Sequence, residues 1–154
     1  MTEAASVHAS AVLTGAHAIL IRGPSGSGKS RLALALIDAA RSRLIPFARL
    51  IGDDRVHLEA HHGRLLVRPH ASLAGLIEVR GLGIRRLPHE PVALVGWVVD
   101  LNHDAAERMP APATQHADIS GIRLPRLALA AGIDPLAPVL AFLATAPAAT
   151  LKGG

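Results

Sequence analysis

The apolar positions of the chain fall into short runs separated by Gly, Pro, Asp and His. Residues 16–22 predict a buried strand, and residues 29–41 carry apolar side chains at helical spacing. Residues 44–51 form a second apolar run, which ends in Gly52-Asp53-Asp54. This succession of strand, helix and strand has a suitable length for a right-handed crossover between parallel strands.

The second half of the chain predicts mostly strands. Residues 57–60 and 64–68 flank a polar His-His-Gly turn and predict a hairpin, whereas residues 72–76 are ambiguous. The other expected elements are a valine-rich strand at 92–101, a proline-containing loop at 109–114, a strand at 122–129 and a helix at 135–145. No repeat or linker divides the chain. We therefore expect one α/β domain over residues 1–154, with a mixed β-sheet and flanking helices.

Composition narrows the possible partners. Half of the 154 residues are hydrophobic, but there are only one Trp, two Phe and no Tyr, so aromatic stacking on nucleic acid is not expected. The net charge of +4 is mild and its basic residues are scattered. The absence of Cys excludes a disulfide framework and thiol chemistry.

The amino terminus does not resemble a secretory signal. Residues 1–11 include Glu3 and His8 and have no basic segment followed by an apolar stretch. No uninterrupted apolar run approaches the length that spans a membrane. From these features we expect a cytoplasmic protein without a membrane partner.

One segment has a specific chemical signature, the phosphate-loop pattern G-x-x-x-x-G-K-[ST]. It consists of Gly23, Pro24, Ser25, Gly26, Ser27, Gly28, Lys29 and Ser30. Glycines let the backbone curl around an anion, and the following helix adds its positive end. Lys29 is one of only two lysines and is expected to reach the outer phosphates, while the Ser30 hydroxyl is suited to Mg²⁺. The pattern predicts binding of a nucleoside triphosphate.

Carboxylates near this loop suggest phosphoryl transfer as well as binding. Asp53 and Asp54 follow an apolar run, where a metal-organising acid and a base are expected in such a sheet. Successive side chains of an extended chain point opposite ways, so only one of the pair is expected to face the metal. Glu78 stands among apolar residues with two glycines nearby, but spacing alone favours a solvent-facing strand position.

Taken in order, these segments resemble the catalytic domain of HPr kinase/phosphorylase. The resemblance rests on His8, the loop 23–30, the Gly-Asp-Asp-Arg-Val of residues 52–56 and the Leu-Ile-Glu-Val-Arg-Gly-Leu-Gly-Ile of residues 76–84. The last segment is the most specific of them. The resemblance implies that ATP phosphorylates a seryl side chain of the phosphocarrier HPr or a related carrier, and that phosphate can reverse the reaction to give pyrophosphate.

The resemblance also implies roles for individual residues. It makes Lys29 the phosphate-contacting lysine, Ser30 and Glu78 the Mg²⁺ ligands, and Asp54 the proton acceptor for the seryl hydroxyl. Asp53 is the reserve candidate for that base.

Two further positions match the family more loosely. His8 precedes the phosphate loop by the family's interval. Arg108, beyond the long strand, resembles a family arginine that neutralises developing phosphoryl charge.

Some features depart from the family pattern. Only seven residues precede His8, so the chain resembles a short proteobacterial form without the amino-terminal domain. Residues 134–138 replace the Pro-Gly-Arg-Asn type loop associated with phosphorolysis, which leaves that direction open. The family tends to form hexamers, so a homo-oligomer is expected.

Three alternatives stay open. A nucleotide or shikimate type of small-molecule kinase would share the loop but needs an arginine-rich lid. A nucleotide-dependent regulator would bind ATP and a partner without transfer. A metal site at His57, His61 and His62 would require a helix where a hairpin is expected.

Overall fold

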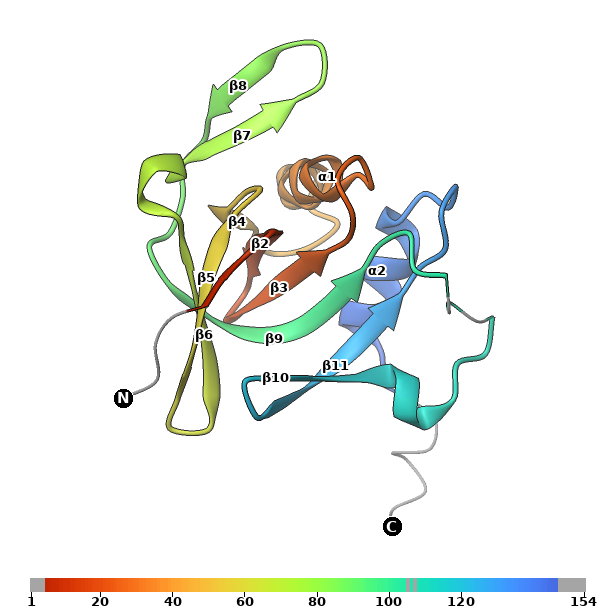
Figure 1. Cartoon of the computed structure of the whole chain (residues 1–154). Coiled ribbons are helices and arrows are strands. Elements are labelled where there is room, and N and C mark those ends of the chain that lie inside the picture. The colour runs from red at the N-terminus through yellow and green to blue at the C-terminus, as the bar shows by residue number, and fades with distance from the viewer. Residues whose placement is uncertain (1–4, 105, 107, 147–154) are drawn as a thin grey trace.

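A nine-stranded mixed sheet curls through the fold, and two helices pack on one side of it (Figure 1). The computed structural model describes residues 5–104, 106 and 108–146. Along the sheet the strand order is β1-β5-β6-β9-β3-β2-β4, with β11 beside β9 and β10 beside β11. The strands are β1 (Ala5–Val7), β2 (Ala9–Thr14), β3 (His17–Arg22), β4 (Arg49–Gly52), β5 (Val56–His61), β6 (Arg64–Pro69), β9 (Ala93–Asp100), β10 (His116–Ile119) and β11 (Ile122–Ala128).

The remaining elements are two helices, a small hairpin and two short 3₁₀ turns. They are α1 (Lys29–Arg41), α2 (Leu136–Ala144), β7 (Leu76–Val79), β8 (Gly83–Arg86), η1 (Ala71–Leu73) and η2 (Pro112–Gln115). Strands β7 and β8 pair only with each other, as a separate two-stranded sheet. In the described part of the chain, no helix has the length and apolar character needed to cross a membrane.

Strand β3 lies at the centre of the sheet and is buried on both faces. Ile19 and Ile21 join the core cluster that includes residues of α1 and α2, whereas Ala18 and Leu20 join a cluster made by strands on the opposite face. This alternation follows from the period of two along a strand. Because both faces are covered, the strand has the continuous apolar sequence from which it was predicted.

Most of the predicted elements are confirmed. Helix α1 has the predicted bounds, and the strand before it, the β5–β6 hairpin, β9, β11 and the terminal helix are all present. These match the expected α/β fold with a mixed sheet. The second strand of the crossover begins at Arg49, because residues 44–48 are bends and coil rather than strand.

The crossover joins parallel strands, as predicted, with strand β2 between them. Strand β2 pairs antiparallel with both β3 and β4, so β3 and β4 point the same way without being neighbours. No element is predicted for residues 9–14, because this small-residue strand lacks a clear alternation of apolar and polar positions. The hairpin β7–β8 and strands β1 and β10 were not predicted either.

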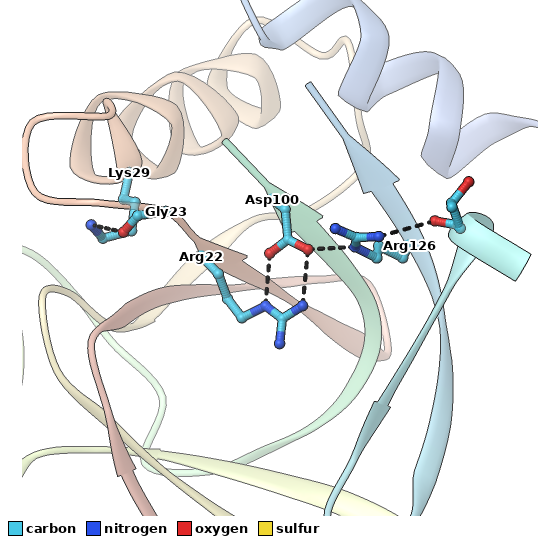
Figure 2. A network of polar contacts seen from close by, with 6 residues as sticks. Arg22, Gly23, Lys29, Asp100 and Arg126 are labelled. Atoms are coloured by element: carbon cyan, nitrogen blue, oxygen red, sulfur yellow. Dashed lines mark hydrogen bonds and ion pairs between the residues drawn. The ribbon is translucent and has the colours of Figure 1, made fainter. Parts of the chain in front are cut away.

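A partly buried ion cluster joins the carboxyl ends of the three parallel strands β3, β9 and β11 (Figure 2). The carboxylate of Asp100 is bound by Arg22 Nε at 2.7 Å and Arg22 Nη2 at 2.9 Å, and by Arg126 Nε on its other side. Burial raises the pKa of Asp100, but hydrogen bonds and charge from the two guanidinium groups outweigh it and hold the pKa below its ordinary value. Asp100 is therefore ionised and fixes the strand that leads into the phosphate loop.

We predict that Asp100→Asn destabilises the protein by about 2–3 kcal/mol at pH 7, less than the roughly 3–5 kcal/mol for a fully buried pair because Arg22 is partly exposed. A carboxylate with a lowered folded-state pKa stabilises above its unfolded pKa of about 3.9 and loses this effect as pH falls through the folded value. The difference between wild type and variant should thus be full at neutral pH and shrink in the acid range below about pH 4.

Urea unfolding at several pH values measures this difference. Asp38→Asn is the matched control, because Asp38 also pairs with an arginine, Arg41, but on the exposed surface of α1. It is expected to change stability very little. Equal effects of the two substitutions would contradict the account of Asp100.

Candidate active site

The phosphate loop, residues 23–30, connects the carboxyl end of β3 to the start of α1. Gly28 precedes the helix with φ 97° and ψ 21°, a left-handed conformation that glycine adopts without steric cost. No side chain caps the helix, and its first turn contains no acidic residue. The first amide groups of α1 are thus available to an anion, and the helix dipole favours negative charge there.

A pocket of about 900 Å³ opens over this loop. Its lining combines the loop with side chains from the amino-terminal strands, from the turn after β4 and from the β7–β8 hairpin. The lining residues are His8, Gly23, Pro24, Ser25, Gly26, Ser27, Gly28, Lys29, Ser30, Arg31, Leu34, Asp54, Glu78, Val79 and Arg80. Segments far apart in the sequence therefore converge on one phosphate-binding loop.

Close packing and a lysine hold the beginning of the loop in place. Lys29 Nζ donates to the carbonyl of Gly23 at 2.8 Å, as Figure 2 shows, and to that of Pro24 at 3.2 Å. A Cβ atom on Gly23 would lie 2.6 Å from Ser27 Oγ and 3.0 Å from the Leu101 carbonyl oxygen. Only glycine fits at this position without a shift of the neighbouring backbone.

Asp53 lies under the loop, with 3% of its surface exposed. Its carboxylate accepts hydrogen bonds from Ser10 Oγ at 2.6 Å, from Ser30 Oγ at 2.8 Å and from the backbone N–H of Glu78 at 3.2 Å. These donors come from β2, α1 and β7. A single carboxylate thus connects the start of the helix to the segment that carries Glu78.

Asp54 is placed differently from its neighbour. It has φ 68°, a left-handed conformation that is uncommon for a residue other than glycine, and its exposed side chain lines the pocket. Because the carboxylate of Asp53 is engaged by three donors, Asp54 is the acid of the pair that is accessible from the pocket. Asp54 is thus the exposed member of the pair, and its role as the base stays a prediction.

The two predicted Mg²⁺ ligands, Ser30 and Glu78, both line the pocket. A hydroxyl and a carboxylate are oxygen ligands, which Mg²⁺ prefers. Among the described residues, no group of three or more His, Asp or Glu could hold a metal ion by itself. The two oxygen ligands would suit an ion that takes its other ligands from phosphate and water, as Mg²⁺ usually does in phosphoryl-transfer sites.

The alternative metal site at three histidines is not assembled. His57 lies on β5, where its Nε2 is 2.9 Å from Nδ1 of His70, while the rings of His61 and His62 pack edge to face at the hairpin turn. The described residues contain no suitable metal cluster there either.

His8 reaches the same pocket from the junction of β1 and β2. Its Nε2 lies 3.3 Å from Arg55 Nη2. A guanidinium group can only donate, so this contact is a hydrogen bond in the tautomer of His8 that leaves Nε2 free to accept. Arg55 thereby orients the imidazole at the rim of the site.

Arg108 is not brought to the pocket. It is exposed in the segment between β9 and η2 and is not among the lining residues. Its role in charge neutralisation stays a prediction.

Comparison with known proteins identifies the family. The family described as HPr Serine kinase C-terminal domain matches residues 1–88, which is more than half of the 154-residue chain. This chain belongs to that family. The matched part contains the phosphate loop, both aspartates and Glu78.

Individual proteins with similar sequences are named after the same family. An HPr kinase/phosphorylase of Mycoplasma mycoides is 40% identical over 89 residues, which cover 58% of this chain and 25% of that protein. One from Clostridium tetani is 41% identical over 70 residues, covering 46% of this chain and 21% of that protein. The matches thus span about a quarter of the length of these curated relatives.

A solved structure shows the same fold. The HPr(Ser) kinase/phosphatase of Coxiella burnetii superposes with a TM-score of 0.72 at 23% sequence identity, over 91% of this chain and 94% of that one. The likeness confirms the HPr kinase C-terminal fold for the chain.

Three residues at or below the pocket had no assigned role in the sequence analysis. Arg31 and Arg80 line the pocket, and Ser10 supports Asp53 from below. Basic residues near a phosphate loop are a weak signal that the sequence did contain. Nothing in the sequence of β2 distinguishes Ser10, because only the pairing of β2 with β4 brings it near Asp53.

We predict that Asp53→Asn reduces the Mg²⁺-dependent increase in ATP affinity by about 10–100-fold, the usual effect of removing a residue that orients a metal ligand. The amide nitrogen of Asn would face a donor, either the Ser30 hydroxyl or the Glu78 N–H, so the two ligands would lose their common support. Binding of a fluorescent ATP analogue, titrated with and without Mg²⁺, measures the effect.

Asp118→Asn is the charge-matched control, because Asp118 is exposed on β10. It should bind the analogue like wild type. If Asp53→Asn also behaves like wild type, Asp53 does not position the metal ligands.

Proposed function

We propose that this chain is an ATP-dependent protein-serine kinase that acts on HPr or a related phosphocarrier protein. The observation that carries the proposal is the different placement of the Asp53 and Asp54 carboxylates. One carboxylate is buried and hydrogen-bonded to Ser30 at the end of the loop, and the other lines the pocket together with the phosphate-binding loop. A site that only binds nucleotide does not need this second, accessible acid.

The proposed reaction assigns each group one task. The loop amides and Lys29 hold the ATP phosphates, and Asp54 accepts the proton of the seryl hydroxyl as its oxygen attacks the γ-phosphorus. The bond from the γ-phosphorus to the β–γ bridging oxygen breaks, and ADP leaves. His8, held by Arg55, lies at the rim of the same pocket, where it can contact the reacting groups.

Mg²⁺ is the proposed cofactor, with Ser30 and Glu78 as its protein ligands. When bound, it would neutralise the charge that develops on the phosphates. Asp53 would keep both ligands in place through the hydrogen bonds described above.

The choice of acceptor rests on the family and on its named relatives, HPr kinase/phosphorylases of which the matches span about a quarter. Assembly into a hexamer and a cytoplasmic location stay predictions from the resemblance. Phosphorolysis stays open, and phosphorylated carrier with inorganic phosphate, read out as pyrophosphate, is the assay for it.

We predict that the purified protein transfers label from [γ-³²P]ATP to a serine of HPr or its nitrogen-system relative in the presence of Mg²⁺. Asp54→Asn should lower the rate at least about a hundredfold while ATP binding is retained, because it removes the proton acceptor. Lys29→Ala should abolish transfer because it removes the loop's only side-chain cation. Phosphoserine analysis of the carrier is the readout.

Asp118→Asn again serves as control and should transfer at the wild-type rate. Normal ATP binding with no transfer to either carrier would contradict the proposal and favour a nucleotide-dependent regulator.

A further inference from the structure

The β7–β8 hairpin stands apart from the main sheet beside the start of α1 (Figure 1). Its base is closed by a hydrogen bond from Leu87 N–H to the Gly75 carbonyl at 2.8 Å. On its inner side, Ile77 is buried in the core and Val79 packs against the same cluster. The hairpin is thus anchored along one face only.

The other face of the hairpin carries the proposed metal ligand. In the pairing register, Glu78 lies opposite Ile84 and Leu76 lies opposite Arg86, so these four side chains share one face. Ile84 is 64% exposed, and Leu82 at the turn is 65% exposed. Two large apolar side chains are therefore open to solvent close to the proposed reaction centre.

The hairpin is also strongly basic. Arg80, Arg85 and Arg86 are all exposed, and within the described part of the chain none of the three forms an ion pair. By contrast, Arg22, Arg49, Arg68 and Arg126 each pair with a carboxylate. Arg80 also lines the pocket, so the positive charge continues from the hairpin to the site.

We propose that the outer face of the hairpin, formed by Leu82, Ile84 and Arg86, docks the protein substrate through an acidic surface that has an apolar centre. The inference rests on the proposed function. A partner held there would lie beside Glu78, and its hydroxyl could enter the pocket at Asp54. Charge complementarity supplies the orientation, and the two apolar side chains supply contact area.

Charge argues against a second copy of this chain as the occupant. A twofold contact through this face would bring Arg86 of both copies together, with Arg80 in the adjoining turn, and like charges at an interface disfavour association. An acidic partner would instead neutralise the positive charge of the arginines in the hairpin.

The test compares steady-state phosphorylation of the carrier by wild type, Ile84→Ser and Arg86→Glu. Neither residue lines the nucleotide pocket. Each substitution is expected to raise KM for the carrier at least tenfold with kcat and ATP affinity unchanged, and Arg86→Lys should restore most of the wild-type KM. For Arg86→Glu, the dependence of kcat/KM on salt should also weaken.

Arg64→Glu is the charge-matched control, because Arg64 is exposed in the β5–β6 hairpin. It should leave KM for the carrier unchanged. Circular dichroism and ATP binding verify that each variant is folded.

The outcomes separate this inference from the proposed function. If wild type transfers no phosphate to any carrier, the proposed function fails, and docking is then tested by direct binding of the carrier to wild type and Arg86→Glu. If wild type transfers phosphate and both hairpin variants keep its KM, the docking surface is wrong. A change in sedimentation of the variants with unchanged KM would assign the face to contact between copies and overturn the inference.

Discussion

The carboxylate of Asp53 is the contact on which the site depends. It receives hydrogen bonds from β2, from the first turn of α1 and from β7, three segments that are distant in the sequence. Burying a charge without partners is costly, so the position is stable only when all three segments are in place. The folded position of the helix and that of Glu78 are thus set by the same group.

A second buried carboxylate, that of Asp100, binds the residue before the phosphate loop. Among the described residues, Ser10, Asp53 and Asp100 are the buried polar or charged ones, and all three are hydrogen-bonded. Asp100 fixes Arg22 immediately before the loop, whereas Asp53 fixes Ser30 at its end. The loop is therefore held at both ends by hydrogen bonds to a buried carboxylate, and its amides are pre-organised for an anion.

Elements with a clear pattern in their own residues could be predicted from the sequence. The apolar run of β3, the period of α1 and the loop motif between them do not depend on the rest of the chain, and their predicted positions agree with the structure. Strand β2 was missed because its role is set by pairing, as it inserts between β3 and β4. The same pairing brings Ser10 to Asp53, a contact that sequence spacing does not contain.

The residues of the site could also be predicted in part, where a motif, a position in the chain or the family resemblance indicated them. Lys29, Ser30 and Asp54 were expected from motif and position, and all three line the pocket. Glu78 was assigned by resemblance, since spacing favoured a solvent-facing strand. It is in fact exposed, but its hairpin turns it toward the phosphate loop. The different exposure of the two aspartates goes with the left-handed backbone at Asp54, which the sequence does not reveal.

The most direct test is a crystal structure of the protein with Mg²⁺ and a non-hydrolysable ATP analogue. The account predicts phosphates on the amides of residues 23–30, Mg²⁺ in contact with Ser30 and Glu78, the Asp54 carboxylate facing the γ-phosphate, and Asp53 still buried beneath Ser30. Mg²⁺ bound away from Glu78, or a γ-phosphate that Asp54 does not face, would contradict it.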